Sequence, residues 1–442
     1  MFQTFKNAFK VPDLRRRIFF TLLMLIIFRF GAHVPVPYMS ADAMKAFLGD
    51  GLDLFSLFNV FTGGAFEQAT VMALGVSPYI NASIIIQLLT VAIPALERLA
   101  KEGVEGRKKI NKITRYLGIV LALVQGTGLY ITLHNMGVEA SMTTITNEGP
   151  LAFATIVLTF AAGTAFIVWL GEQITEKGLG NGVSMIIFAG IVSSIPSGII
   201  TLYQNFLPAG FEIWGIVKFV LIAALAILAI AFVVLFNTAE RRIPVQYAKR
   251  VVGRKMYGGQ NTNIPIKVVM GGVMPIIFAS SIMAFPATIV RLATGGNLPQ
   301  TGIGGTILGM LTAGLGPKWT DIVYAVLYFL LIIFFTYFYS SIQFNPVELA
   351  NNIQKNGGSI PAIRPGKPTS EYISKVTNRL NFAGAIFLGI VAIMPIFLGA
   401  IFNIPSLQIG GTSLLIMEGV ALETVQQIES QMTMRHYKGF LE

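Results

Sequence analysis

The composition of this 442-residue chain is that of a membrane protein. Hydrophobic residues make up 54% of its positions and charged residues 12%, whereas soluble domains carry about a quarter charged residues. The formal net charge is +11, and the lack of cysteine excludes disulfides, thiolate metal sites and a nucleophilic cysteine. We therefore expect a single membrane domain that is stabilised by helix packing.

Apolar segments of membrane-spanning length recur along the whole chain. A span needs about 20 mostly apolar residues, which predicts ten spans, at 18–35, 69–93, 115–135, 150–171, 183–203, 213–236, 269–290, 321–342, 380–402 and 410–428. Arg15, Arg16 and Arg17 before the first span imitate a signal peptide, but no convincing cleavage site follows, so a retained helix is preferred. The sequence thus predicts an all-α integral membrane protein.

Between the first two spans lies an apolar segment that is too short to cross a membrane. Leu54, Leu57 or Phe58, and Phe61 follow Asp53 at helical spacing, and the pattern breaks at Gly63 and Gly64. Such a helix either lies at the membrane interface or folds back into a cavity between the spans. The spacing favours neither alternative.

Basic residues are divided unevenly among the loops. The N-terminal arm, the loops at 95–117, 238–268 and 343–379, and the C-terminal tail hold nearly all of them, whereas the alternate loops hold only Lys45, Arg291 and Lys318. Lys and Arg near span ends stay on the cytoplasmic side. Both termini are therefore predicted to be cytoplasmic.

Two spans carry the same motif, Gly-Val-x-Pro-x-Ile-x-Ala-Ser, which begins at Gly75 and again at Gly272. A weaker echo, Gly-x-Ser-x-x-Ile, begins at Gly182 and at Gly411, and a further glycine follows each copy at Gly190 and Gly419. The predicted orientation sends the two copies of the first motif across the membrane in opposite directions. The sequence therefore predicts an inverted repeat, with five spans in 1–203 and five in 204–442, around a central pathway.

The residues that the repeat places at depth are apolar. Ile80 corresponds to Ile277, and Ile187 corresponds to Ile416, while Val76 and Val183 lie one helical turn from Ile80 and Ile187. Branched aliphatic side chains that converge from four helices can close a pathway to ions by excluding water. Ordinary helix packing is the alternative for each residue taken alone.

Neither an active site nor a metal or cofactor site is expected. His33, His134 and His436 fall in loops or the tail, and the glycine-rich segments at 178–182 and 302–305 lack a preceding strand and a phosphate-binding lysine. Within or beside the spans, the ionisable residues singled out are Arg29, Lys218, Glu418 and Glu423. Snorkelling or pairing inside the bundle is the preferred interpretation for Arg29 and Lys218. Glu418 is turned about 200° from Ile416 around the helix, and its sequence context indicates no role.

The basic loops exceed what membrane orientation requires. One loop holds two tyrosines, Tyr247 and Tyr257, and the cations Arg241, Arg242, Lys249, Arg250, Arg254 and Lys255. Such a cluster is typical of docking to RNA phosphates or to an acidic protein surface, while attraction to anionic lipid headgroups is the alternative. In the next basic loop, a Pro-Gly turn is expected to present Arg364 and Lys367.

Several motifs together resemble the SecY family of protein-translocation channels over essentially the full length of the chain. They are the Gly75 motif with its continuation to Leu89, Trp169-Leu170-Gly171-Glu172-Gln173-Ile174-Thr175-Glu176, Phe188-Ala189-Gly190-Ile191-Val192, Arg364-Pro365-Gly366 and Gly410-Gly411-Thr412-Ser413-Leu414-Leu415-Ile416. The resemblance implies a channel in a bacterial cell membrane that passes unfolded secretory polypeptides. It would also release apolar segments sideways into lipid through a lateral gate between the second and seventh spans.

The resemblance also assigns roles to particular residues. It implies an apolar pore ring of Val76, Ile80, Val183, Ile187, Ile277 and Ile416, and a plug helix at 53–64. The candidate lateral-gate residues are Asn81, Gln87, Val269 and Ser280. The implied partners are SecE, SecG, the SecA motor ATPase, the ribosome at the loops 238–268 and 343–379, signal sequences and membrane lipids.

The chain departs from the family pattern in three respects. Valine at 76 and 183 stands where isoleucine is common, Val269 stands where asparagine is common, and Glu418 stands where an apolar residue is usual. Our hypothesis is that Asn81 supplies the polar group that Val269 lacks.

A secondary transporter for a small solute is the alternative function, because such carriers share inverted repeats. The scarcity of charged groups at depth and the large basic loops favour the channel. A membrane scaffold, the third class, would need no aliphatic ring.

Overall fold

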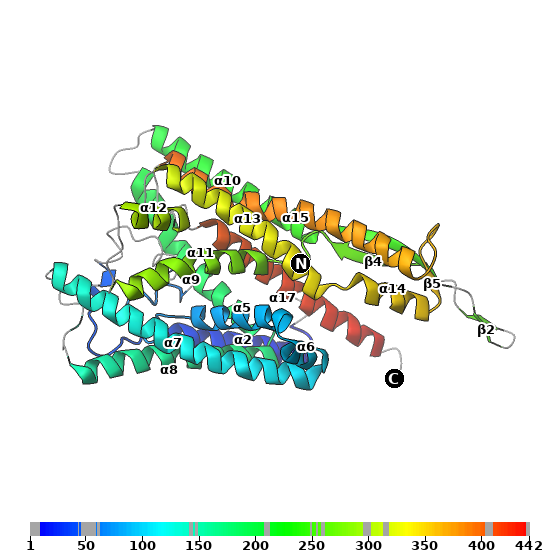
Figure 1. The fold of residues 1–442 in the computed structure, drawn as a ribbon, viewed down its shortest axis with the longest axis horizontal. Coiled ribbons are helices and arrows are strands. Elements are labelled where there is room, and N and C mark those ends of the chain that lie inside the picture. Colours follow the sequence, from blue (N-terminus) through cyan, green and yellow to red (C-terminus); the bar gives the residue numbers. More distant parts are fainter. Residues whose placement is uncertain are drawn as a thin grey trace.

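The computed structural model describes residues 9–42, 44–45, 59, 62–140, 145, 149–206, 213–247, 250–252, 255–257, 261–294, 302–312, 318–402 and 410–438. It is a bundle of long helices from which a β-hairpin projects at one end (Figure 1). Each of the ten predicted spans overlaps one helix, namely α2 (Pro12–Gly31), α5 (Ser77–Ala92), α7 (Val104–Ala140), α8 (Pro150–Lys177), α9 (Gly182–Phe206), α10 (Ile213–Thr238), α11 (Met274–Ala293), α13 (Lys318–Gln343), α15 (Lys367–Phe402) and α17 (Gly410–Lys438). Three shorter helices are α6 (Pro94–Lys101), α12 (Gly302–Leu311) and α14 (Pro346–Lys355).

Many of these helices are long and apolar enough to cross a membrane. Within the described ranges, six meet both conditions, namely α7, α8, α9, α10, α13 and α15, and the sharply bent pair α5 and α6 makes seven if it is one span. In α2, the arginines at 15, 16, 17 and 29 interrupt the apolar run, and α11 carries only a short apolar stretch. The chain is an all-α membrane protein in its spanning part.

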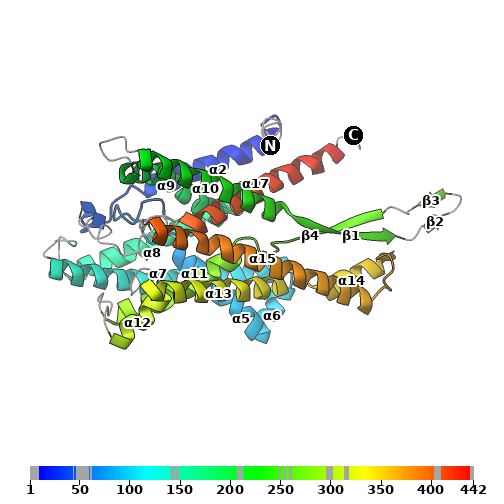
Figure 2. The ribbon, with the colours of Figure 1, turned by 90° about the horizontal axis from the view of Figure 1, so that it is seen from above.

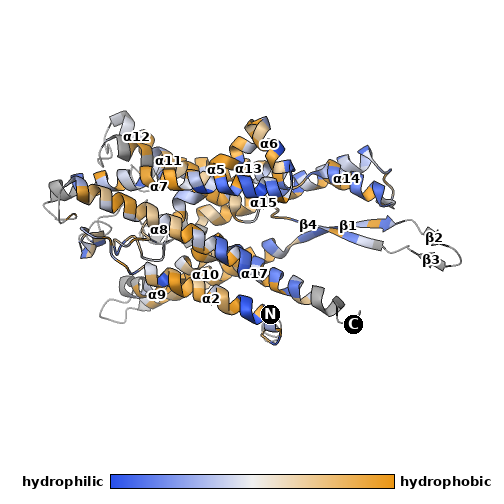
Figure 3. Cartoon of the chain, turned by 90° about the horizontal axis from the view of Figure 1, so that it is seen from below, coloured by the Kyte–Doolittle hydropathy of each residue, from blue (hydrophilic) through white to orange (hydrophobic). Residues whose placement is uncertain are grey.

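Polar residues gather at one end of the bundle. Figure 3 shows them on the hairpin, on α14 and on the outer part of α17, while apolar residues dominate the middle of the helices. The ends of α2 and α17 that carry the described chain termini point toward the same end (Figure 2). This arrangement agrees with the charge asymmetry of the loops.

Two predicted spans begin later than expected. Residues 71–76 and 270–273 are turns, and α5 and α11 start only at Ser77 and Met274. Gly75 and Gly272 have φ values of +58° and +55°, which favour glycine because it has no Cβ. Val76 and Val273 then cap the two helices with nearly identical backbone angles, and each helix has a proline in its first turn, where no donor is lost. The sequence motif is therefore repeated as a backbone conformation.

The helices of the two predicted halves pack in the same order. In the first half, α7 contacts α5 and α8, and α8 contacts α9; in the second half, α13 contacts α11 and α15, and α15 contacts α17. In the same way, α2 packs against α8 and α9, and α10 packs against α15 and α17. This correspondence supports a repeat of five helices, whose boundary near residue 203 stays a prediction.

The predicted loop at 238–268 contains strands. β1 (Glu240–Tyr247) pairs with β4 (Asn261–Lys267), and β2 (Arg250–Val252) pairs with β3 (Lys255–Tyr257) nearer the tip. β5 (Gly358–Ser359), from the next basic loop, adds to β1, which gives the order β4-β1-β5. Behind this sheet, an apolar cluster joins the strands to α14 and α15, with Ile243, Val245, Ile266, Ile353, Ile360 and Ile373 at its centre. The two basic loops therefore form one unit, which we call the docking unit (residues 240–267 and 346–373, as far as they are described).

Candidate functional site

The residues predicted to form the pore ring lie in one apolar cluster. Ile80 comes from α5, Ile187 from α9, Ile277 from α11 and Ile416 from α17, and Val76 and Val183 belong to the same cluster. Ile187 is 6% exposed and Ile416 is 3% exposed, while Ile80, Val183 and Ile277 are half-buried. Four helices, two from each predicted half, thus bring all six side chains together.

The contacts within this cluster are those of apolar side chains. They are not directional, so they form and break without leaving a buried polar group unpaired. Where such side chains line a pathway, they exclude water from it without any charged group.

The sequence prediction missed Val273, which packs against the same cluster. Val273 is the counterpart of Val76 in the repeated motif, so the repeat itself carried the signal. Gly419 lies beside it, because a Cβ on Gly419 would stand 3.4 Å from Val273. Gly419, the glycine that follows the weaker echo, therefore lets α17 pack closely against Val273. We call the apolar cluster that holds the six predicted ring residues and Val273 the ring cluster.

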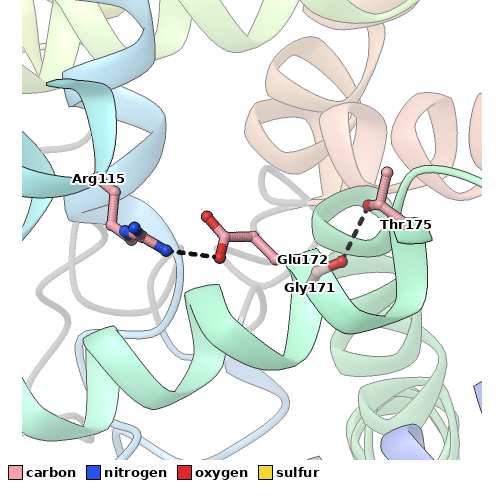
Figure 4. A network of polar contacts seen from close by, with 4 residues as sticks. All are labelled: Arg115, Gly171, Glu172 and Thr175. Atoms are coloured by element: carbon pink, nitrogen blue, oxygen red, sulfur yellow. Dashed lines mark hydrogen bonds and ion pairs between the residues drawn. The ribbon is translucent and has the colours of Figure 1, made fainter. Parts of the chain in front are cut away.

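A polar joint fixes the start of α9, which carries Val183 and Ile187. Thr175 Oγ1 donates to the carbonyl of Gly171 at 2.9 Å and accepts from the amide of Gly182 at 2.9 Å. Figure 4 shows the first of these bonds beside the ion pair between Arg115 Nη1 and Glu172 Oε2, 2.9 Å long, which links α7 to α8. A Cβ on Gly182 would come within 1.9 Å of the Gly171 oxygen, so only glycine fits this close approach.

The glycine-rich loop at 178–182 uses its amides within the bundle. The amide of Leu179 donates to Thr21 Oγ1 of α2 at 3.0 Å, and the amide of Gly180 donates to Gln427 Oε1 of α17 at 2.6 Å. Because side chains of other helices already accept from these donors, loop geometry explains the glycines better than a phosphate site does.

The segment predicted as a plug is described only at Asn59 and at its end, residues 62–64. Asp53, Leu54, Leu57, Phe58 and Phe61 lie outside the described residues, whereas Gly63 and Gly64 lie within them. Residues 62–66 fold into the bundle, since Thr62 and Phe66 are each 2% exposed and Ala65 is fully buried. For these residues, the structure agrees with folding back between the spans.

The two predicted gate helices both contribute apolar side chains to one cluster. Ile84 of α5 is buried in one cluster with Ile276 and Phe278 of α11. The predicted gate residues Asn81 and Gln87 are half-buried on α5. Their role at the gate stays a prediction.

The other two predicted gate residues are placed differently. Ser280 donates to the carbonyl of Ile277 in its own helix at 3.0 Å. Val269 is 4% exposed, and its Cα lies 3.7 Å from where a Cβ on Gly384 of α15 would stand. Val269 therefore lies against α15, just before the turn that leads into α11.

Glu418 joins α17 to α10. Its side chain is buried, and Asn237 Nδ2 donates to its Oε2 at 2.5 Å. The residue thus faces α10, whereas Ile416 packs in the ring cluster, as the two-residue step around the helix predicts.

The docking unit presents most of its described cations to solvent. Arg241 and Arg242 are exposed on β1, and Arg242 Nε lies 2.7 Å from Glu240 Oε1. Arg364 and Lys367 are exposed at a turn whose Gly366 has φ +95°, and the Arg364 carbonyl accepts from Thr369 Oγ1 at 2.8 Å. Arg250 and Lys255 belong to β2 and β3, whereas Lys249 and Arg254 lie outside the described residues.

A family model described as SecY matches residues 70–425. The chain belongs to the SecY family. Over full lengths, it is 44% identical to the protein translocase subunit SecY of Streptomyces galbus and 45% identical to that of Halalkalibacterium halodurans. The SecY of Aquifex aeolicus is 43% identical, again over the whole of both chains.

Solved channel structures share the fold of this SecY-family chain. One, described as the structure of a protein conducting channel, has a TM-score of 0.62 at 18% identity. A second, of a SecY protein whose plug domain stabilises the closed state, has a TM-score of 0.65 at 20% identity, and each covers 96% of both chains. A third is Sec61 in a canine ribosome-channel complex, with a TM-score of 0.60 at 19% identity.

Membership of the SecY family decides between the functions that the sequence left open. The chain is a protein-conducting channel subunit and not an enzyme, and the alternative of a small-solute transporter is not supported.

Proposed function

We propose that unfolded secretory polypeptide crosses the membrane through the ring of Val76, Ile80, Val183, Ile187, Ile277 and Ile416. The observation that supports this most directly is the meeting of all six side chains, from four helices, in one apolar cluster. At rest, the ring excludes water and ions, and during transport it closes around the passing chain. The energy for transport comes from a partner.

The lateral gate of this proposal lies between α5 and α11. Moving an apolar signal segment from water into lipid at this gate lowers its free energy. Binding of the segment shifts the channel toward the open state only if the segment binds the open state more tightly than the closed state. Ile84 of α5 and Phe278 of α11 belong to one apolar cluster, and such a segment would replace part of its packing. In this proposal, Asn81 supplies the polar group at the gate, because Val269 has none.

The segment at 53–64 takes the place of a plug that seals the resting channel. A plug domain stabilises the closed state of the related SecY protein. In this chain, the burial of Thr62 and Ala65 within the bundle supports the same role.

Partners bind the cytoplasmic side in this proposal. The docking unit receives the ribosome or the SecA motor, SecE and SecG complete the channel, and both termini face the cytoplasm from a bacterial cell membrane. The exposed arginines of β1 and the turn at Arg364 support the docking role, because clustered cations attract phosphates and acidic surfaces. A related channel has been solved in complex with a ribosome.

Site-specific crosslinking tests the pathway. A photoreactive amino acid at position 187 should crosslink to a secretory chain stalled during transport by the assembled complex. The matched control is position 199 of the same helix, because Ile199 is 52% exposed and is not among the residues of the apolar cluster that holds Ile187. Crosslinking at both positions or at neither, in a complex that transports normally, would contradict the proposed path.

Two substitutions test the remaining parts. Asn81→Leu should change which signal sequences are accepted, and unchanged selectivity and transport would refute the role of Asn81. Charge reversal at Arg241 and Arg364 should weaken binding of the ribosome or SecA, most strongly at low salt, where exposed charges act at longer range. If the charge-reversed variants bind these partners as tightly as the parent does at every salt concentration, the docking role of this unit is refuted.

A further inference from the structure

Arg29 of α2 places its cation inside the bundle, against a main-chain carbonyl. Its Nη1 donates to the carbonyl of Gly63 at 2.7 Å and to Ser193 Oγ of α9 at 3.0 Å. A charged group within a membrane-spanning helix is costly and is retained mostly where it has a function. The sequence predicted only snorkelling or pairing for Arg29. Its hydrogen bonds to Gly63 and Ser193 indicate a more specific role.

The carbonyl that Arg29 holds belongs to a tightly seated glycine. Gly63 has φ +66°, and a Cβ on it would stand 2.6 Å from Ser193 Oγ, 2.8 Å from Arg29 Nη1 and 3.0 Å from Gly190 Cα. Gly190 is the glycine that follows the weaker sequence echo. Two glycines therefore let the main chain at Gly63 approach the main chain of α9 closely enough for Arg29 to hold it.

Gly63 lies in a compact turn, residues 62–67, which we call the plug-end turn. The Asn59 carbonyl accepts from the Gly64 amide at 2.9 Å and from Thr62 Oγ1 at 3.2 Å. The Asn59 side chain in turn accepts from the Glu67 amide at 3.0 Å and donates to Glu67 Oε2 at 3.2 Å. Because these bonds tie Asn59 to the turn, whatever holds Gly63 also holds Asn59.

The plug-end turn also contacts the start of α5. A Cβ on Gly75 would come within 2.6 Å of Thr62 Cγ2, and Gly75 directly precedes Val76 of the proposed ring. The turn thus lies against α2, α9 and the entrance to α5 at once. Because Arg29 bonds both Gly63 and Ser193 of α9, movement of the turn away from α9 has to break at least one of these hydrogen bonds.

We propose that Arg29, with Ser193, is a positioning residue that latches the plug-end turn in the resting channel. This inference rests on the proposed function, because it assigns the turn to the plug. Charge-assisted hydrogen bonds are roughly twice as strong as neutral ones when water is excluded. Water that enters the opening channel competes for the guanidinium, so this polar latch weakens on opening although the apolar ring does not depend on it.

Thiol labelling tests the latch directly. The chain has no cysteine, so Thr62→Cys introduces a single thiol at a position that is 2% exposed. In vesicles that contain the assembled resting complex, a membrane-impermeant maleimide added on the non-cytoplasmic side should label this thiol slowly. Adding Arg29→Gln should raise the labelling rate at least about tenfold, as expected for the loss of one charge-assisted hydrogen bond.

Two neighbouring serines supply matched variants. Ser193 and Ser194 each donate to the carbonyl three residues earlier, at 2.7 and 2.8 Å, but Ser193 also accepts from Arg29. Ser193→Ala should raise the labelling rate severalfold, while Ser194→Ala should leave it unchanged. Arg29→Lys keeps the charge and should restore slow labelling in part, which a merely structural loss of packing would not show.

The outcomes separate the latch from the channel. Equal labelling in the parent, Arg29→Gln and Ser193→Ala overturns the latch, and if Arg29→Gln fails to assemble, Ser193→Ala against Ser194→Ala decides. Crosslinking from position 187 to a stalled chain is measured in the same parent complex. Crosslinking that persists while labelling is unchanged refutes the latch alone, whereas its absence refutes the proposed function.

Discussion

Truncation of Ile187 to alanine tests the apolar ring. The side chain is 6% exposed and packs in the same cluster as Val76 and Ile416. Burial of an isoleucine side chain contributes about 1.5–3 kcal/mol, and alanine retains little of it, so the closed state should lose about 2 kcal/mol relative to an open state that frees this side chain. At about 1.4 kcal/mol per factor of ten, the open fraction of the resting channel rises about thirtyfold.

Ion leak is the direct measurement of this change. Reconstituted vesicles that contain the assembled complex, without a secretory substrate, should lose a trapped ion faster with Ile187→Ala than with the parent. Ile199→Ala makes the same chemical change on the same helix, but Ile199 is 52% exposed, so its leak should equal that of the parent. If the two variants leak equally at matched protein levels, an apolar seal at Ile187 is refuted.

The double variant Ile187→Ala with Ile416→Ala extends the test to both halves. The two residues are counterparts in the weaker echo and belong to one cluster, so their effects on leak should not simply add. Additive effects would indicate two independent packing sites.

Two further predictions concern the helices that support the ring. Asn237→Leu removes the donor from the buried Glu418 carboxyl and should lower the free energy of unfolding of the solubilised complex by about 2–4 kcal/mol, whereas Glu418→Gln, which keeps an acceptor oxygen, should cost less than about 1 kcal/mol. Equal melting temperatures for the two variants would contradict this role of the bond. Gly182→Ala should prevent assembly or lower the melting temperature strongly, since its Cβ would meet the Gly171 oxygen at 1.9 Å, while Gly198→Ala in the same helix meets nothing within 4 Å and should be tolerated.

The membrane class and most of the helices could be predicted because hydropathy is a property of single residues summed along the chain. The beginnings of α5 and α11 could not, since the residues before them are as apolar as those within them. There, the positive φ of Gly75 and Gly272 ends the turn and sets the first helical residue. The pairing of β5 with β1 could not be predicted either, because it joins segments that lie far apart along the chain.

The candidate ring could be predicted from the repeat, which marks equivalent positions without any knowledge of packing. Val273 carries the same mark, as the counterpart of Val76 in the repeated motif. The role of Glu418 needed a partner on another helix, Asn237, which no spacing along α17 indicates.

The sequence by itself determined that the chain resides in a membrane, which of its loops carry the positive charge, and which apolar positions recur in the two halves. Only the tertiary structure decided that Ile80, Ile187, Ile277 and Ile416 meet in one cluster, because the rotation of each helix about its axis depends on packing against its neighbours. It also decided what Arg29 holds. Because every residue has a main-chain carbonyl, the sequence could not indicate that Arg29 bonds the carbonyl of Gly63.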